Sequence, residues 1–314
     1  MLGKEKTFSI LISGSAGFIG SNLIDFLIKE NEIVGIDNFS NGKIENIKKH
    51  LKSKKMKLYK HDLKNPLKIS ENVDFIFHLA AKIKNNKEAY HENLKITKNI
   101  LEIARKKDVK KIIYFSSTKV YGLKYNNVEI DESFKCYAND FYGRSKLISE
   151  RIIKNFCKNY GIKFLIIRLP RVYGPKDWQK TFYSLFLLEK FFGIGINSKL
   201  YLNLVYVKNL SKLSKEFLKN KKFDNEIFNV NDGFFKIFEI SKTIEKILNK
   251  KIIHLNIPDS IFKIYSYVSG SFTHARKKII YSNKKLKKII SNYPFYSLTY
   301  GLKDTINYYE NKYF

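Results

Sequence analysis

Cysteine is scarce in this chain, which has only Cys136 and Cys157 among 314 residues. Two cysteines are too few for a disulfide scaffold, and they are typical of a protein that is kept in a reducing compartment. We therefore expect two unpaired thiols and a cytoplasmic location. The cysteine spacing matches no metal-binding motif and the six histidines are scattered, so we expect no metal site.

Long apolar runs are also lacking. No stretch of about 18 apolar residues occurs, so we expect no membrane span. The first apolar run is soon interrupted by Ser13, Gly14, Ser15 and Gly17, and no small-residue cleavage site follows a long enough core. This pattern argues against a signal peptide.

Arginine is rare, although the formal net charge is +30, with 59 basic and 29 acidic residues. Such a charge fits a protein that binds nucleic acid or a membrane surface. However, only six basic residues are arginine, the side chain best suited to base readout, and the lysines are spread over the whole length. We interpret the lysines as a solvated coat and expect no nucleic-acid partner, with a functional basic patch as the alternative. A basic surface would also attract a dianionic substrate.

Short apolar runs alternate with longer amphipathic stretches in the first half. Strands are expected at 8–12, 32–36, 56–59, 73–78, 111–115 and 163–168, and helices at 21–30, 43–51, 88–107 and 141–159. This alternation predicts an α/β fold with a Rossmann-type, doubly wound parallel sheet that helices cover on both faces.

The pattern changes after Arg168, where Pro170, Gly174 and Pro175 mark a loop. Helices are expected at 181–192, 238–248 and 303–310, and strands at 202–207 and 226–230. We expect both late strands to rejoin the sheet. Because no linker rich in proline, glycine or serine separates the halves, we expect a small second lobe that is interleaved with the sheet domain. The predicted sheet domain is 1–170 plus about 202–232, and a smaller interleaved C-terminal lobe is 171–201 and 233–314.

Gly14, Gly17 and Gly20 lie between the first strand and the first helix. Gly14 can make a tight turn, Gly17 lets the backbone approach a pyrophosphate, and Gly20 permits close packing of the helix on the strand. The helix N-terminus favours the anion. Three glycines alone would fit a plain turn, but this placement predicts a dinucleotide site.

Carboxylates follow the next two strands. Asp37 could accept hydrogen bonds from both hydroxyls of an adenosine ribose and would repel a 2′-phosphate, which favours NAD over NADP. Lys43 lies close in sequence and could weaken that preference. Asp62 could contact the adenine edge, and the N-cap of a helix explains it equally well.

Tyr142 and Lys146 are four residues apart, so they share one helix face. A nearby ammonium and an oxidised nicotinamide both favour a phenolate, which would make Tyr142 a usable base near neutral pH. Ser117 follows the fifth strand at the sheet edge where ligands bind in such folds, and Ser116 and Thr118 are its nearest competitors. Together these residues predict a nicotinamide redox site.

These motifs give the chain its family resemblance. It resembles the extended short-chain dehydrogenase/reductase family, in the NAD-dependent nucleotide-sugar epimerase/dehydratase branch. The matching stretches are 14–20, 36–42, 77–81, 116–122, 142–146, 172–175, 203–207, 228–230 and 298–305. The resemblance implies that the sheet domain binds NAD and that the lobe binds substrate.

The resemblance also implies roles by position. Ser117, Tyr142 and Lys146 would be catalytic, and Lys146 would also hold the nicotinamide ribose. The implied cofactor-binding residues are Gly14, Gly17, Phe18, Ile19, Gly20, Asp37, Asn38, Asp62, Leu79, Ala80, Ala81, Asn93, Tyr142 and Lys146. Asn93 would buttress the site. The candidate substrate-binding residues are Thr118, Arg171 and Arg276, the two arginines for a diphosphate.

One departure from the family narrows the expected reaction. The 4,6-dehydratases of the family carry an acidic residue beside the catalytic hydroxyl, whereas Thr118 and Lys119 stand there. We therefore expect a nucleoside-diphosphate-sugar epimerase that acts at C4 through a transient keto intermediate. A 4-ketoreductase or dehydrogenase on the same scaffold and a non-catalytic dinucleotide-sensing protein remain alternatives. Relatives that pair through two helices imply a possible homodimer through 88–107 and 141–159.

Overall fold

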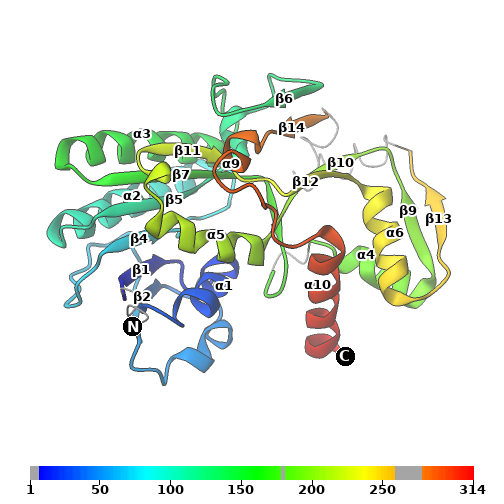
Figure 1. Ribbon diagram of the computed structural model, residues 1–314, viewed down its shortest axis with the longest axis horizontal. Coiled ribbons are helices and arrows are strands. Elements are labelled where there is room, and N and C mark those ends of the chain that lie inside the picture. Colours follow the sequence, from blue (N-terminus) through cyan, green and yellow to red (C-terminus); the bar gives the residue numbers. More distant parts are fainter. Residues whose placement is uncertain (1–6, 178–180, 259–277) are drawn as a thin grey trace. The chain divides into compact units, whose positions relative to one another are not determined.

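Strands and helices alternate along the first half of the chain as the sequence predicts, and seven strands form one parallel sheet in the computed structural model (Figure 1). The structure describes residues 7–177, 181–258 and 278–314. The sheet order is β11-β7-β5-β4-β1-β2-β3. The strands are β1 (Ser9–Ser13), β2 (Glu32–Asp37), β3 (Met56–Lys60), β4 (Phe75–His78), β5 (Lys111–Ser117), β7 (Lys163–Leu169) and β11 (Glu226–Asn229).

Contacts divide the chain into two compact units. The first unit is Met1–Gly122, Lys135–Arg168 and Leu210–Phe228, and the second unit is Leu123–Phe134, Leu169–Asn209 and Asn229–Phe314. The first unit contains nearly all of the parallel sheet.

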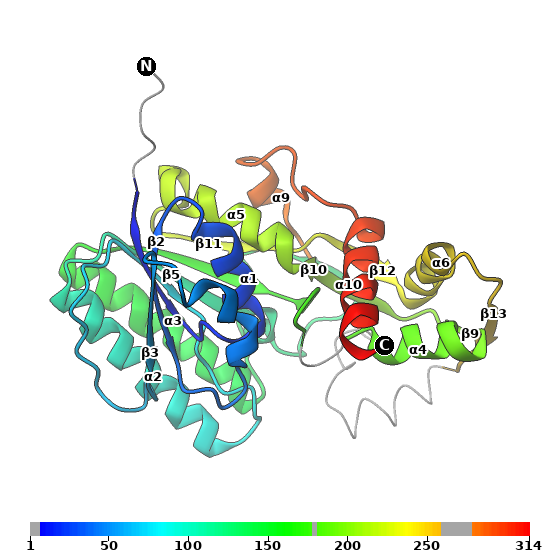
Figure 2. The ribbon, with the colours of Figure 1, turned by 90° about the horizontal axis from the view of Figure 1, so that it is seen from below.

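Helices cover both faces of the parallel sheet (Figures 1 and 2). One face carries α2 (Lys87–Lys106) and α3 (Phe141–Tyr160), and the other carries α1 (Phe18–Leu27) and α5 (Val207–Lys219). The core between the sheet and the α2–α3 face is aliphatic, and burial of these side chains drives the packing. Its fully buried members include Leu11, Ile76, Ile100, Ile112, Ile153 and Ile166.

The strand register brings the functional loops to one edge. Ser13 of β1 pairs with Ile36 of β2 on one side and with His78 of β4 on the other. His78 in turn pairs with Tyr114 of β5. The chain therefore leaves these parallel strands at the same carboxyl edge, where ligands bind in open α/β sheets.

The described residues of the second unit form three small sheets and several helices. Its strands are β8 (Arg171–Tyr173), β10 (Tyr201–Tyr206) and β12 (Gly233–Lys236) in one sheet, β9 (Ile194–Asn197) with β13 (Ile253–Asn256), and β6 (Val128–Ile130) with β14 (Ile279–Tyr281). Its helices are α4 (Tyr183–Leu187), continued by a π-helical turn (Leu188–Phe192), α6 (Ile237–Leu248), α9 (Lys284–Lys287) and α10 (Leu298–Tyr313).

The late strands only partly follow the prediction. The strand expected at 226–230 joins the parallel sheet as β11, but the strand expected at 202–207 does not. That segment is β10, which pairs with β12 and β8. Its buried Asn203 donates to the carbonyl oxygen of Ile279 and accepts from the backbone N–H of Tyr281. Because a buried amide needs such partners, these bonds anchor β10 to β14 within the second unit.

The helix expected at 43–51 is also different. The segment forms two 3-10 turns, Ile44–Asn46 and Lys48–His50. The backbone N–H of Lys43 and the side chain of Asn46 both donate to the carbonyl oxygen of Ala16, at 3.1 and 2.9 Å. The segment is thus tied to the glycine turn. Neither Cys136 nor Cys157 forms a disulfide, as predicted. No helix among the described residues is long and apolar enough to span a membrane.

Candidate active site

The glycine turn between β1 and α1 has the geometry of an anion cradle. Gly14 has φ +73°, in the left-handed region that favours glycine, and its N–H donates to the carbonyl oxygen of Ile36. A Cβ atom on Gly20 would lie 2.2 Å from the carbonyl oxygen of Gly14. Helix α1 begins at Phe18 with no capping side chain and no acidic residue in its first turn. Its first N–H groups can therefore bind a pyrophosphate.

The rim of this turn keeps exposed surface. Gly14, Gly17, Phe18 and Ile19 are partly exposed, whereas Gly20 is buried against the strand. The structure thus places four of the five predicted pyrophosphate-turn residues where a ligand could reach them. The turn as a whole fits the diphosphate of a dinucleotide.

Asp37 ends β2 beneath the glycine turn. Its side-chain oxygens accept hydrogen bonds from the backbone N–H groups of Ala16 and Phe39, at 2.9 and 2.8 Å. Burial raises the pKa of Asp37, and these hydrogen bonds act against that rise. The carboxylate therefore fastens the turn to β2, a structural role that sequence reasoning did not foresee. Each oxygen still has capacity to accept from a ribose hydroxyl.

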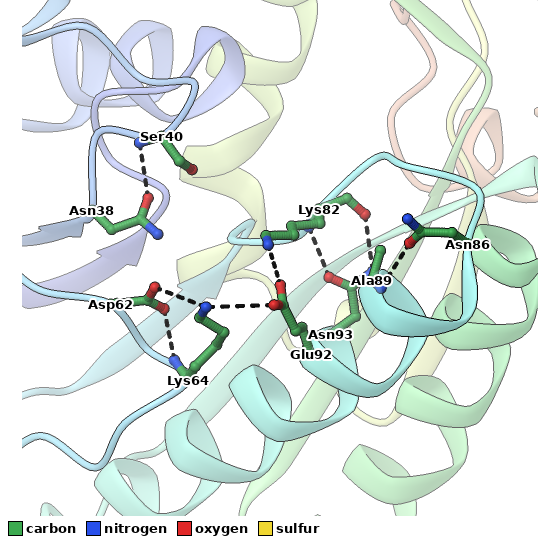
Figure 3. Close-up of polar contacts among 9 residues, drawn as sticks. All are labelled: Asn38, Ser40, Asp62, Lys64, Lys82, Asn86, Ala89, Glu92 and Asn93. Atoms are coloured by element: carbon green, nitrogen blue, oxygen red, sulfur yellow. Dashed lines mark hydrogen bonds and ion pairs between the residues drawn. The ribbon is translucent and has the colours of Figure 1, made fainter.

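Asp62 lies in a network of charges beyond β3 (Figure 3). It accepts from the backbone N–H of Lys64 at 3.0 Å, and Lys64 Nζ lies 3.4 Å from Glu92. The other oxygen of Glu92 pairs with Lys82 at 2.5 Å. Burial tends to raise the pKa of Asp62, but the bonds from Lys64 and Asn38 together lower it. Asp62 begins no helix, so the N-cap explanation is wrong and a turn role replaces it.

Asn93 joins two elements around the predicted site (Figure 3). Its oxygen accepts from the backbone N–H of Lys82 at 2.7 Å. Its amide nitrogen donates to the carbonyl oxygen of Lys82 at 3.0 Å and to Ser145 Oγ at 3.1 Å. Buried Asn93 thus fixes the segment after β4 against α3. Asn38 lies near Asp62, and its oxygen accepts from the backbone N–H of Ser40.

The segment Leu79–Ala81 follows β4 beside the glycine turn. Leu79 and Ala80 donate their backbone N–H groups to Ser13 Oγ at 3.1 and 3.2 Å. A Cβ atom on Gly14 would lie 3.1 Å from the nitrogen of Ala80. Leu79, Ala80 and Ala81 are all partly exposed at this sheet edge. The structure therefore brings two separate predicted cofactor segments together.

The three predicted catalytic residues lie on β5 and α3 of the first unit. Ser117 is the last residue of β5, and its Oγ accepts from the backbone N–H of Lys119 at 3.3 Å. Tyr142 and Lys146 are one turn apart near the start of α3. Lys146 Nζ donates to the carbonyl oxygen of Phe115 at 2.8 Å and lies 5.8 Å from the ring centre of Tyr142. This lysine therefore ties the helix to the strand that ends in Ser117.

The protein alone does not make Tyr142 acidic. Burial raises the pKa of Tyr142, and the charge of Asp140 raises it further. Burial lowers the pKa of Lys146 to about 7, and the charge of Glu150 acts in the opposite direction. These residues by themselves favour a neutral phenol. The expected fall in the pKa of Tyr142 would therefore have to come with the bound cofactor.

Comparison with known proteins identifies the family. Residues 10–191, more than half of the chain, match the model of the NAD dependent epimerase/dehydratase family. The chain belongs to this family. It is an NAD-dependent sugar epimerase or a related oxidoreductase, and the predicted family, fold and cofactor are confirmed.

Three similar proteins align with nearly the whole of this chain. A putative UDP-glucose 4-epimerase of Methanocaldococcus jannaschii is 29% identical over 304 residues, which are 90% of this chain and 97% of that protein. The UDP-glucuronic acid 4-epimerase from Bacillus cereus, solved with NAD, matches with a TM-score of 0.79 and 23% identity over 98% of this chain and 100% of that one. UDP-glucose 4-epimerase from Thermotoga maritima, solved with UDP-glucose, matches with a TM-score of 0.77 and 23% identity, covering 96% and 99% of the two chains.

The predicted substrate-binding residues lie in different parts of the chain. Thr118 is buried in the 3-10 turn that follows Ser117. Arg171 begins β8 in the second unit, where it pairs with Leu204 of β10. Arg276 lies outside the described residues.

Among the described residues, no group of histidine, cysteine, aspartate and glutamate side chains could hold a metal ion.

Sequence reasoning missed several polar residues near the predicted catalytic residues. His78 contacts Ser13 Oγ at 2.9 Å and Thr97 Oγ1 at 3.2 Å, and burial together with the charge of Lys146 lowers its pKa to about 3. Glu150 and Arg168 form a buried ion pair. The sequence does contain one sign of such buried polar residues. Arg168 is a charged residue within an otherwise apolar strand, a position that is expected to be buried.

Proposed function

We propose that this chain is a nucleoside-diphosphate-sugar epimerase that inverts C4 through a transient keto sugar and retains its NAD. The carrying observation is the arrangement of Ser117, Tyr142 and Lys146 on β5 and α3, in the unit that also contains the glycine turn. The names of the relatives support a nucleotide-sugar substrate, since they include epimerases, decarboxylases and a dehydratase of such sugars.

Different residues of the chain would bind different parts of NAD. The first turn of α1 would hold the pyrophosphate, Asp37 would accept from the adenosine ribose, and Asp62 would meet the adenine edge. Leu79, Ala80 and Ala81 would line the cleft. Bound NAD supplies the hydride acceptor and, in the reverse step, the hydride donor.

Tyr142 is the acid/base in this proposal. Its phenolic oxygen takes the proton from the C4 hydroxyl of the sugar. It returns the proton after the keto sugar has rotated in the site to present its other face to the cofactor. Ser117 Oγ hydrogen-bonds the same sugar oxygen. Lys146 favours the phenolate by its charge and holds the nicotinamide ribose. Thr118, Arg171 and Arg276 are the proposed contacts to the substrate.

The test begins with the purified chain. Bound dinucleotide is released by denaturation and identified by mass spectrometry, and UDP-, GDP- and dTDP-sugars are screened for interconversion by NMR. We expect a C4 epimer pair to equilibrate with no net formation of NADH. Stoichiometric consumption or production of NAD(P)H would instead support the ketoreductase or dehydrogenase.

The decisive variant is Tyr142→Phe, which removes only the phenolic oxygen. We expect turnover to fall by about 100-fold or more while the dinucleotide content stays at the parental level. Turnover at the parental rate with cofactor still bound would show that Tyr142 is not the base.

The proposal extends to a homodimer through α2 and α3. Leu147 and Ile148 on α3 are apolar and remain partly exposed, which supports a partner on that face. Light scattering of the purified chain should give twice the monomer mass. Ile148→Glu should then shift the measured mass toward that of the monomer. A monomer mass for the parent chain would contradict the proposal.

A further inference from the structure

Helix α3 carries a further buried charge, Glu150, one turn after Lys146. Glu150 is 1% exposed. One of its oxygens accepts from Ser116 Oγ at 2.5 Å and from Arg168 Nε at 3.1 Å, and the other accepts from Arg168 Nη2 at 2.7 Å. Both oxygens therefore have partners, and one of these partners directly precedes Ser117.

Arg168 extends this network to the turn after β5. It comes from β7 and is 4% exposed. Its Nη1 donates to the hydroxyl of Tyr121 at 3.0 Å, and its guanidinium lies 4.9 Å from the centre of that ring. Tyr121 ends the 3-10 turn that starts at Thr118. One ion pair thus joins α3, β5, β7 and the turn that follows Ser117.

Stability alone is a weak reason for such a pair. Desolvation of two charges offsets much of their attraction, and packed apolar residues of similar volume often stabilise a protein as well. Charges in a dry interior act strongly on neighbouring titratable groups, however. Glu150 raises the pKa of Arg168 against the effect of burial, and it also opposes the fall in the pKa of Lys146.

We propose that Glu150 and Arg168 are positioning residues of the epimerase reaction, which fix the β5 end that carries Ser117 against the helix that carries Tyr142 and Lys146. The two opposite charges also act on the charge of Lys146 in opposite directions. This inference rests on the proposed function.

Other titratable groups face the same residues and stay unchanged in the test. The groups facing Lys146, Tyr142 or the ion pair are Tyr114, whose ring centre is 4.8 Å from Lys146 Nζ, His78, Lys119, Asp140, Tyr121 and Cys136. Because these groups are the same in every variant, differences between variants report the ion pair.

The first measurement is the pH dependence of kcat for UDP-galactose and UDP-glucose. Glu150→Gln removes a negative charge, which lowers the proton affinity of Tyr142 and Lys146, so the profile should move toward acid by about one pH unit. Arg168→Gln removes a positive charge and should move it toward alkali. We expect kcat to fall about tenfold or more in both, with KM changed less. The double variant should regain the parental profile and keep the low kcat.

A matched control is Glu102→Gln, which breaks the exposed ion pair of Glu102 with Arg105 on α2. It should leave the profile and kcat unchanged. A merely structural role for Glu150 and Arg168 would lower the melting temperature without moving the profile in opposite directions. Unshifted profiles in both single variants would overturn the proposal.

A second readout needs no substrate. The side-chain 13Cε resonance of Lys146, assigned by its absence in Lys146→Met, is titrated in the parent and in Ser116→Ala, Glu150→Gln and Arg168→Gln. Its midpoint should fall in Glu150→Gln, rise in Arg168→Gln, and move little in Ser116→Ala, the mildest change. If no tested sugar is converted, the proposed function fails while this titration still decides the inference; equal midpoints in all variants would overturn the inference alone.

Discussion

Each unit of the chain buries a carboxylate, but the two carboxylates have different partners. Glu150 in the first unit forms an ion pair with the guanidinium of Arg168, so its partner carries the opposite charge. Among the described residues, Asp232 in the second unit accepts from neutral donors, which are the backbone N–H of Tyr206, the side chain of Asn209 and the hydroxyl of Tyr293. Burial raises the pKa of Asp232 to about 6, and these bonds oppose the rise only in part.

This difference separates two uses of a buried acid. A guanidinium answers the charge of a buried carboxylate with an opposite charge in a fixed geometry, which suits a group that positions an active site. Neutral donors leave the acid free to take up a proton near pH 6. The second unit should therefore be more sensitive to pH than the Glu150–Arg168 network next to the proposed catalytic residues.

The largest expected effect comes from breaking the charged pair. Arg168→Gln leaves Glu150 as an unpaired buried charge and should lower the free energy of unfolding by about 3–5 kcal/mol. Urea denaturation at pH 7 measures this loss. The loss should shrink in the Glu150→Gln/Arg168→Gln double variant, because neither charge then stays uncompensated. Equal losses in the single and double variants would contradict the charge argument.

The next effect is a pH dependence of stability from Asp232. Its folded pKa is raised from 3.8 to about 6, so its stabilising contribution is present below pH 4 and is lost as the pH rises through 6. The loss should be about 3 kcal/mol. Asp232→Asn should remove this slope, because Tyr293 can turn its hydroxyl to accept from the new amide.

Urea denaturation of the parent and of Asp232→Asn between pH 4 and pH 7 measures this effect. The two curves should lie closest at pH 4, where Asp232 is protonated, and diverge toward pH 7 as the parent loses stability. Parallel curves would show that Asp232 does not titrate in this range.

The smallest expected effect is at a partly exposed pair. Glu92 ion-pairs with Lys82 and Lys64, all of which keep contact with solvent. Because water screens such pairs, Glu92→Gln should change the free energy of unfolding by less than about 1 kcal/mol. A loss as large as that of Arg168→Gln would remove the distinction between buried and exposed pairs.

Much of the first unit could be predicted because its signals are local. The glycine spacing, the apolar runs of the parallel strands and the four-residue step from Tyr142 to Lys146 each depend on neighbours in sequence. Asn93 was implied only by resemblance, since its contacts with Lys82 and Ser145 span 11 and 52 residues.

The errors arose where long-range partners decide the structure. The segment 202–207 reads as a buried strand, but only its contacts with β8, β12 and the backbone at Ile279 assign it to a separate sheet. The segment 43–51 has a helical pattern, yet hydrogen bonds to Ala16 hold it in two 3-10 turns. Neither set of contacts leaves a signal in the local sequence.

The sequence by itself determined the parallel sheet, the anion-binding turn and the helix face shared by Tyr142 and Lys146, because side-chain periodicity and glycine conformation act over a few residues. Only the tertiary structure decided which acid lies behind that lysine and whether the acid meets a cation or neutral donors. Glu150 and Arg168 lie on different elements, 18 residues apart. Their pairing depends on a helix and a strand packing together, and the arrangement of charges at the candidate active site follows from that packing.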